Sequence, residues 1–319
     1  MSYLLAPHSS APPDLASDKL KWWSQHIHQH LHRQLIDSST ARDRARLTCI
    51  NDSHAASWLS ACPSENVGLK VATSDFRLLL RWWLGLPITD EPAATRCQLC
   101  GGFVDVYGDH YLCCPRGGFY NRHQTVVAHL SHVAKAAGLR VSFEESVPEG
   151  IRPADMLISS WPTPGTSLAI DVSVIHPLGL SHQPHLVARS DAYLEQVERV
   201  KNNAYASACG RVGWQFAPVI FSTFGKVGPK GREAVSKLFN FYTSALATEK
   251  EREKALWQLH QQLQVVMKKA VARMLQIGVG LMNTFPPEDS TTTLLPSSTA
   301  ITSTTTISSS YIIHVESGV

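Results

Sequence analysis

Hydrophobic residues recur at intervals of three and four along the first part of the chain, the spacing that places side chains on one face of an α-helix. The pattern appears at residues 19–35, around residues 55–59 and at residues 74–84, where a Gly-Leu-Pro sequence follows as a helix stop. The first stretch has its apolar side chains at Trp22, Trp23, Ile27, Leu31 and Leu35. We therefore predict an all-helical region over residues 19–93.

A different rhythm begins after residue 120, where short β-rich segments follow a helical one. The expected elements are a helix at 122–137, strands at 139–146, 155–160 and 168–175, a helix at 185–207, a strand at 214–223 and a helix at 230–246. A Pro/Gly turn at residues 162–165 separates the second and third strands. This order of helices and strands predicts a compact α/β core.

Residues 249–277 are expected to form one more helix, which begins with the charge-dense sequence EKEREK. Its apolar stripe consists of Leu256, Leu259, Leu263, Val266, Ala270 and Met274. Such a stripe usually packs on its own domain, and self-association or a partner helix is the alternative.

The two ends of the chain lack this patterning. Residues 1–18 are rich in Pro, Ser and Ala, and residues 281–319 are dominated by Ser and Thr. Neither segment has the apolar periodicity that could offset the entropy cost of ordering it. We expect a flexible leader and a disordered, low-complexity tail.

Composition narrows the class of protein. The 319 residues are 44% hydrophobic, which excludes a wholly disordered chain and suits one or two packed cores. No apolar run approaches the ~20 residues of a membrane span, and no basic segment leads into an apolar stretch as in a secretory signal. We expect an intracellular protein, nuclear or cytoplasmic, with no membrane partner. A net charge of +3 is too small to indicate a nucleic-acid partner by itself.

The cysteines point to a metal site. Four of the seven cysteines fall in one short stretch that also holds His110. Such a cluster in an intracellular chain is typical of a metal site rather than of a disulfide framework. We predict a structural zinc site in which three thiolates and one imidazole complete a tetrahedron, with Cys114 preferred to Cys113. The predicted ligands are Cys97, Cys100, His110 and Cys114. A set of reduced, partly buried thiols is the alternative.

A second group of histidines lies in the first predicted helix. It consists of His26, His28, His30 and His32. The pairs His26/His30 and His28/His32 are each spaced for one metal ion, but no carboxylate or thiolate accompanies them. We interpret the group as a solvated helix face.

Two carboxylates in the predicted core give the clearest indication of chemistry. Asp155 opens one expected strand, and Asp171 lies inside the apolar run LAIDVSVI of the next. In a hairpin the two carboxylates would meet at one end of the sheet, where they repel each other unless a cation lies between them. Mg²⁺ prefers oxygen ligands and can activate a water molecule for attack on a phosphate. The pair therefore predicts a catalytic magnesium site.

Carboxylates on adjacent strands, within a helix, three strands, helix, strand, helix order, resemble the restriction-endonuclease-like (PD-(D/E)xK) fold. With the preceding Cys-Cys-His-Cys knuckle and the pair Arg122-His123, the chain resembles the C-terminal endonuclease region of certain non-LTR retrotransposon polyproteins. The segments CQLCGG, GDHYLCCPRGG, RHQTVV, RPADMLI, AIDVSVIHPL and GWQFAPVIFSTFG carry this resemblance over residues 75–245. The sequences WLSACP and FRLLLRWWLGLP resemble the linker that joins reverse transcriptase to the knuckle, although no polymerase core is recognisable.

The resemblance implies a division of the chain into parts. These are a leader (1–18), a helical linker-like region (19–93), the zinc knuckle (94–118), a restriction-like endonuclease domain (119–247), an amphipathic helix (248–280) and the tail (281–319).

The resemblance also implies roles for single residues. The parent pattern has a lysine two positions after the second acid, where this chain has Ser173. The retrotransposon variant resembles enzymes in which the lysine has moved to the following helix, and Lys201 with Tyr205 fits that relocation. Lys201 would orient the attacking water or neutralise the scissile phosphate. Glu144 or Glu145 would add a third carboxylate; because neighbouring strand residues face opposite ways only one can serve, and Glu144 is preferred.

Three residues beside the knuckle are candidate nucleic-acid contacts. Arg122 and His123, at the start of a helix, could bind phosphate through their side chains and the helix N-terminus, with a purely structural role as the alternative. Arg116 is the third.

The leading hypothesis is a Mg²⁺-dependent endodeoxyribonuclease that nicks target DNA and leaves a 3′-hydroxyl to prime reverse transcription. The first alternative is a catalytically inactive binding protein for DNA or RNA, in which the knuckle and basic residues contact the phosphate backbone. The basic residues concerned are Arg116, Arg122, Lys226, Lys230 and Arg232. The second alternative is an inert retrotransposon relic that serves only in interaction.

Overall fold

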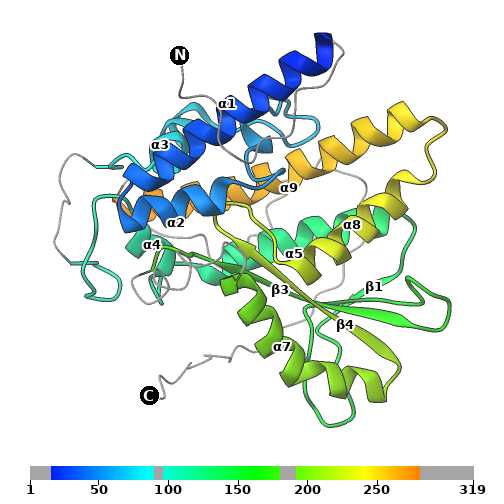
Figure 1. Ribbon diagram of the computed structural model, residues 1–319. Coiled ribbons are helices and arrows are strands. Elements are labelled where there is room, and N and C mark those ends of the chain that lie inside the picture. Colours follow the sequence, from blue (N-terminus) through cyan, green and yellow to red (C-terminus); the bar gives the residue numbers. More distant parts are fainter. Residues whose placement is uncertain (1–15, 90–95, 180–191, 281–319) are drawn as a thin grey trace.

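The computed structural model describes residues 16–89, 96–179 and 192–280 and shows helices packed around one four-stranded sheet (Figure 1). The predicted mixed α/β class is therefore confirmed. The predicted tail lies outside the described residues, as do residues 1–15 of the predicted leader. The leader's last three residues instead belong to the first helix, which begins at Ala16.

The N-terminal part of the described chain is helical, as its apolar spacing predicts. Its elements are α1 (Ala16–Ser38), α2 (Ala41–Ile50), the short 3₁₀ helix η1 (Ser57–Leu59) and α3 (Thr73–Trp83). The helix expected around residues 55–59 is only the single turn η1. The fuller helix is α2, which starts where the Thr40 side chain accepts a hydrogen bond from Asp43 N at 3.1 Å. Its charged residues, in the sequence ARDRARLTCI, interrupt the apolar period and hide it from a pattern search.

The sheet contains β1 (Val141–Phe143), β2 (Met156–Ile158), β3 (Ser167–Ile175) and β4 (Trp214–Ser222), in that spatial order. The first three strands pair antiparallel, whereas β3 and β4 pair parallel. Parallel neighbours need a crossover connection. Here it contains α7 (Ala192–Arg211); the start of the helix predicted at 185–207 lies outside the described residues. The strands predicted at 139–146 and 155–160 are shorter in the structure.

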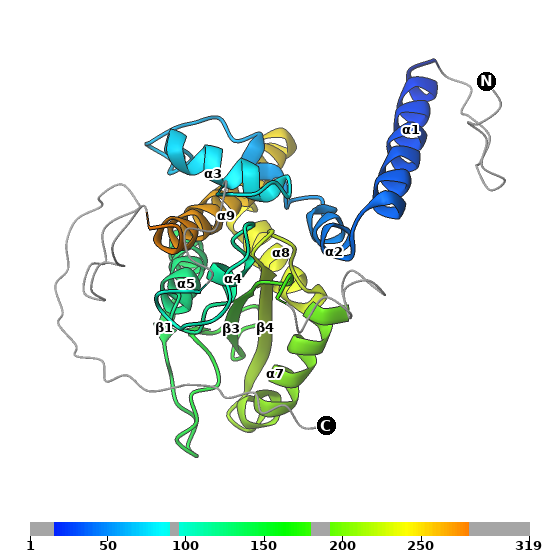
Figure 2. The same ribbon diagram turned by 90° about the vertical axis from the view of Figure 1, so that its left-hand side faces the viewer.

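Helices cover both faces of the sheet (Figure 2). Helix α7 covers one face, while α5 (Phe119–Ala136) and α8 (Pro229–Thr243) cover the other. Side chains alternate along β3, so Ile170, Val172 and Val174 enter the larger core beneath α5 and α8. Ala169 faces the other way, in a small cluster with Leu157 and Cys209 of α7. Asp171 shares the parity of Ala169 and therefore points to the α7 side.

Helix α9 (Glu249–Gly278) lies between the sheet-covering helices and α3 (Figure 2). It begins with a capping box formed by Thr248 and Glu251. Leu259 and Leu263 belong to the core of the sheet, whereas Leu275 belongs to a second core shared with the N-terminal helices. The stripe therefore packs on the chain's own domains. Self-association through this stripe would need these buried side chains to be exposed, so the packing does not support that alternative.

The described helices include none with both the length and the apolar character that a membrane span requires.

Candidate functional site

The two acids predicted to form a pair lie close to each other at one end of β2. The antiparallel register of β2 and β3 ends with Met156 opposite Ile170, and Asp155 directly precedes Met156. Asp155 N donates to Ile170 O at 3.0 Å, so Asp155 lies beside the segment of β3 that carries Asp171. Val172 N also donates to the Asp155 carboxylate, at 2.6 Å. This end of the sheet thus brings the two carboxylates near each other and holds the first of them with a backbone donor.

Lys201 reaches the second acid from α7, the helix that covers the face of β3 on which Asp171 lies. Its Nζ lies 2.6 Å from Asp171 Oδ2. Burial raises the pKa of Asp171 to about 6; the Lys201 charge opposes this rise, and the negative charge of Asp155 adds to it. Asp171 is 8% exposed, so its desolvation outweighs the attraction of a lysine in direct contact. Burial and the charge of Asp155 both disfavour the ionised form of Asp171. A further cation nearby would therefore stabilise that ionised form.

His123, on α5, is the fourth member of this group. Its Nε2 lies 3.1 Å from Asp155 Oδ1. Both oxygens of Asp155 therefore have a partner, one from Val172 N and one from His123. The sequence assigned His123 to nucleic-acid contact, and the structure instead places it beside the first acid. We call the four residues His123, Asp155, Asp171 and Lys201 the acidic-pair site.

Glu144 lies opposite Asp155 but is not part of the acidic-pair site. Extending the β1–β2 register pairs it with Asp155, and its N donates to Asp155 O at 3.2 Å. Its φ of 49° departs from strand geometry, and its exposed side chain pairs with Arg152 at 2.9 Å. Strand alternation favours Glu144 over Glu145 as the neighbour of Asp155. The local backbone nevertheless directs the Glu144 carboxylate to a surface arginine.

Arg122, next to His123 in sequence, has a structural position. Its side chain is buried, and its guanidinium donates to Leu112 O at 3.2 Å and to Val174 O at 2.7 Å. It therefore ties the segment before α5 to β3, and contact with a nucleic acid would require it to leave these carbonyls. The structural alternative is the one that fits this residue.

The contacts that Tyr205 and Arg116 make in the described part of the chain are with residues other than the two acids. The Tyr205 ring packs against Phe216, with centroids 5.8 Å apart, on the α7 face of the sheet. Arg116 is exposed and donates to Leu99 O at 3.3 Å beside the cysteine cluster. Arg116 therefore presents an exposed cationic group beside the cysteine cluster.

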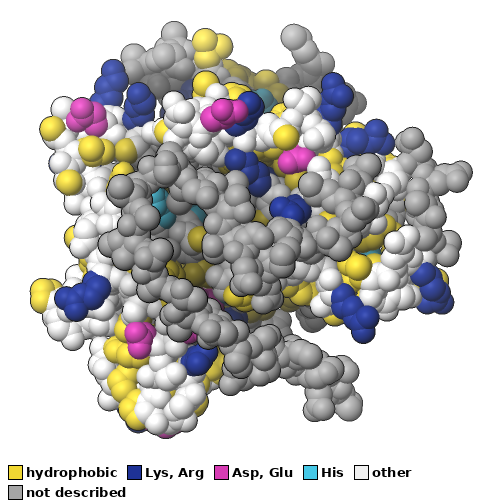
Figure 3. Space-filling view, turned by 180° about the vertical axis from the view of Figure 1, so that it is seen from behind, with side chains coloured by type: hydrophobic (Ala, Val, Ile, Leu, Met, Phe, Trp, Pro, Cys, Tyr) yellow, Lys and Arg dark blue, Asp and Glu magenta, His cyan; other side chains and the backbone are white. Residues whose placement is uncertain are grey.

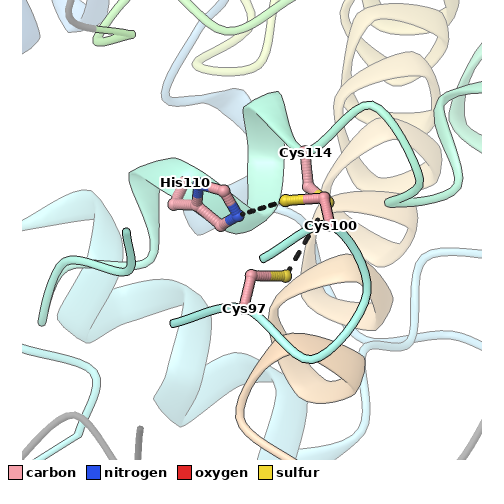
Figure 4. Close-up of side chains that lie close together, drawn as sticks. All are labelled: Cys97, Cys100, His110 and Cys114. Carbon is pink, nitrogen blue, oxygen red and sulfur yellow. Dashed lines mark hydrogen bonds between the residues drawn. The ribbon is translucent and has the colours of Figure 1, made fainter. Parts of the chain in front are cut away.

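The four predicted knuckle ligands converge on one point (Figure 4). One potential ligand atom from each of Cys97, Cys100, His110 and Cys114 lies within 4.8 Å of the others. Cys100 Sγ is 3.3 Å from His110 Nε2, and Cys97 Sγ is 3.8 Å from Cys114 Sγ. This Cys₃His group could hold a metal ion such as zinc.

Local backbone geometry explains why these four side chains meet. His110 lies in the short helix α4 (Asp109–Cys113), and Cys114 directly follows the end of that helix. Gly102 N donates to Cys100 Sγ at 3.4 Å, and this donor is the main cause of the lowered pKa of the Cys100 thiol. A Cβ at Gly102 would lie 2.8 Å from His110 Cε1, so a larger residue would push the imidazole away. Cys113 points elsewhere, with its Sγ 4.0 Å from His176 O. Of the two cysteines, Cys114 is therefore the one that belongs to the Cys₃His group.

A buried polar network, which the sequence did not reveal, joins the cluster to the sheet. Asp109, directly before His110, accepts from Arg42 Nε at 2.6 Å and lies 3.1 Å from His176 Nε2. His176 Nδ1 in turn lies 2.7 Å from Thr223 Oγ1. Arg42 belongs to α2, while His176 and Thr223 follow the ends of β3 and β4. A histidine just after an apolar strand was the only signal in the sequence.

One face of the molecule carries its positive charge in separate patches. On the face drawn in Figure 3, the visible Lys and Arg side chains lie in separate groups rather than in one continuous basic strip. A strongly basic patch would be the usual electrostatic sign of such a partner.

Comparison of the chain with models of known protein families and with curated proteins found no match.

Proposed function

We propose that this protein is a metal-dependent endonuclease that cuts DNA by hydrolysis of a phosphodiester bond. The observation that carries the proposal is the proximity of Asp155 and Asp171 at the end of β2, with Lys201 2.6 Å from the second acid. Adjacent-strand carboxylates joined by a lysine from the next helix fit the relocated form of the PD-(D/E)xK pattern. The order α5, β1, β2, β3, α7, β4, α8 fits the helix and strand order of that fold.

The residues of the acidic-pair site fit a divalent cation such as Mg²⁺. Asp155 raises the pKa of Asp171 through its charge, so the two groups lie close enough to repel each other. Carboxylate oxygens are the ligands that Mg²⁺ takes in proteins. Such an ion supplies a more acidic bound water and stabilises negative charge on the phosphate.

The chain's own groups have separate tasks in this proposal. Val172 N and His123 hold the Asp155 carboxylate in one orientation, through contacts of 2.6 Å and 3.1 Å. Lys201 lies on the partly exposed face of the site, with 20% of its side chain accessible, where its ammonium group can donate to a phosphate oxygen. Tyr205, one turn further along α7, packs against Phe216 and is assigned no step in this proposal.

The proposal is tested by the conversion of supercoiled plasmid to open circle in the presence of Mg²⁺. Asp155→Asn and Asp171→Asn each keep the size of the side chain and remove its charge, so nicking is expected to stop. Glu233→Gln, on the exposed face of α8, is the matched control and should nick like the parent. Absence of nicking by a folded parent protein, with Mn²⁺ also tried, would contradict the catalytic proposal.

A nucleic-acid-binding protein without catalysis is the second candidate, and one observation favours it. Both acids already have a cationic or potentially cationic neighbour, Lys201 for Asp171 and His123 for Asp155. If these pairs only stabilise the fold, the chain would bind DNA or RNA without cutting. Fluorescence anisotropy with labelled DNA and RNA, measured across salt concentrations, separates this case, because phosphate contacts weaken steeply with salt.

A further inference from the structure

Helix α1 carries an apolar stripe that the rest of the described chain leaves exposed. Figure 2 shows α1 standing away from the body of the protein, next to α2. The stripe consists of Leu20, Trp23, Ile27, Leu31 and Leu35, whose exposed fractions run from 37% at Trp23 to 75% at Leu20. Five large apolar side chains in a row on a projecting helix are costly in water and are typical of an interaction face.

Histidines border this stripe on both sides. At about 100° of rotation per residue, the five apolar residues form one band along α1. His26 and His30 follow one edge of the band, and His28 and His32 follow the other. Each pair has the i, i+4 spacing that places two side chains one above the other on the same face of a helix.

The ring of His26 is oriented for metal binding. Its Nδ1 lies 2.8 Å from Trp22 O, and because a carbonyl oxygen can only accept, Nδ1 carries the proton. With the Nδ1 proton directed at this carbonyl, Nε2 is the ring atom that can offer a lone pair to a metal ion. The Trp22 ring lies against the imidazole, with centroids 3.8 Å apart and the ring planes tilted by 30°. A histidine that binds a metal usually donates its second ring N–H to a carbonyl in this way.

We propose that α1 binds a transition-metal ion of the Zn²⁺ class between two copies of this chain. Two imidazoles from one helix fill only half of a tetrahedral shell. If the apolar stripes of two α1 helices pack together, the histidine edge of one helix lies beside a histidine edge of the other, so four nitrogens meet. The second copy therefore covers the stripe and completes the ligand set in one step.

The site is distinct from the Cys₃His group, and spectroscopy separates the two. Co²⁺ bound by thiolates shows sulfur-to-metal charge-transfer absorption, whereas Co²⁺ bound by four imidazoles does not. Titration of the full chain with Co²⁺ should therefore show the thiolate site and a further tetrahedral species without charge transfer. The second species should appear together with a doubling of the mass measured by sedimentation equilibrium.

Variants on α1 test the proposal without disturbing the core. His26→Ala/His30→Ala is expected to remove the second cobalt species and to weaken the metal-induced dimer at least tenfold. Gln25→Ala/Gln29→Ala is the matched control, since it changes an exposed i, i+4 pair of the same helix and should leave both readouts unchanged. Leu31→Glu should keep the dimer from forming even when metal is present. Unchanged metal uptake in the double histidine variant, or metal uptake with no change in mass, overturns the proposal.

Discussion

Lys201 Nζ contacts Asp171 Oδ2 at 2.6 Å across thirty residues of sequence. The contact exists because β3 directs Asp171 toward α7, the helix that leads into the parallel strand β4. Ser173, two residues after Asp171, shares this face of β3 and carries no charge. The cation that contacts Asp171 therefore comes from the helix and not from the strand.

The first prediction concerns this lysine. Lys201→Met removes the ammonium group and keeps most of the apolar stem, so plasmid nicking with Mg²⁺ is expected to fall by at least about a hundredfold, the usual lower bound for such a group. Lys237→Met, which alters an exposed lysine of α8, is the control and should nick normally. Equal nicking by both variants would remove Lys201 from the proposed mechanism.

The elements that the sequence predicts best are long and have a marked hydrophobic pattern. Helices α3, α5, α8 and α9 follow a helical period, whereas β3 is an apolar run buried on both faces. The observed bounds of all five lie within a few residues of the predicted ones. Short elements are harder to predict. Strand β1 is cut to three residues where Glu144 takes a positive φ, a feature that leaves no hydrophobic pattern.

The same distinction between predictable and unpredictable features applies to the candidate site. The cysteine spacing predicts the Cys₃His group because its ligands are close in sequence, and two adjacent strands bring Asp155 near Asp171. The contacts of single side chains depend instead on tertiary packing. Arg122 and His123 are neighbours in one helix, yet one donates to buried carbonyls and the other lies beside Asp155. Their sequence gives no sign of this difference.

The second prediction compares two adjacent cysteines. Cys114→Ser is expected to lose metal, because its Sγ belongs to the Cys₃His group, whereas Cys113→Ser should retain a full equivalent. Zinc content measured by inductively coupled plasma mass spectrometry after gel filtration tests this directly. A loss of zinc from the Cys113 variant alone would reassign the fourth ligand.

The same pair of variants reports on stability. A structural metal contributes its binding free energy to folding. Thermal unfolding should therefore show a lower Tm for Cys114→Ser and for the parent after chelation. Chelation should leave the Tm of Cys114→Ser almost unchanged, since that variant has little metal to lose.

The third prediction concerns Asp109. Asp109→Asn removes the charge that compensates Arg42 in a buried setting and replaces one of the two oxygens that face Arg42 and His176 with an amide donor. Breaking a buried ion pair from one side typically costs about 3 kcal/mol or more. Urea unfolding should show a loss of that size in the free energy of unfolding.

An exposed ion pair provides the comparison for Asp109. Glu233→Gln breaks the surface pair with Lys237 and should leave the free energy of unfolding almost unchanged, because water screens an exposed pair. If the two variants lose the same stability, the Asp109 network does not connect the knuckle to the sheet energetically.

The fourth prediction is a pH dependence of stability that originates at His129. This residue of α5 is buried, and its Nε2 has no hydrogen-bond partner in the described part of the chain. Burial lowers its pKa from 6.5 to about 4, with a smaller contribution from His132. The unfolded chain therefore binds a proton at a higher pH than the folded one. Stability is complete above pH 6.5 and falls as the pH drops from there toward 4, by up to about 3 kcal/mol.

His129→Leu should flatten this part of the profile, because a leucine has no proton to gain in the unfolded state. Chemical denaturation at a series of pH values between 7 and 4 measures the difference between variant and parent. The gap should change in favour of the variant as the pH falls. His132→Gln, an exposed position on the same helix, is the control and should keep most of the parent's slope, because burial is the larger cause of the lowered pKa of His129. A parallel pair of profiles for His129→Leu and the parent would show that other groups cause the acid sensitivity.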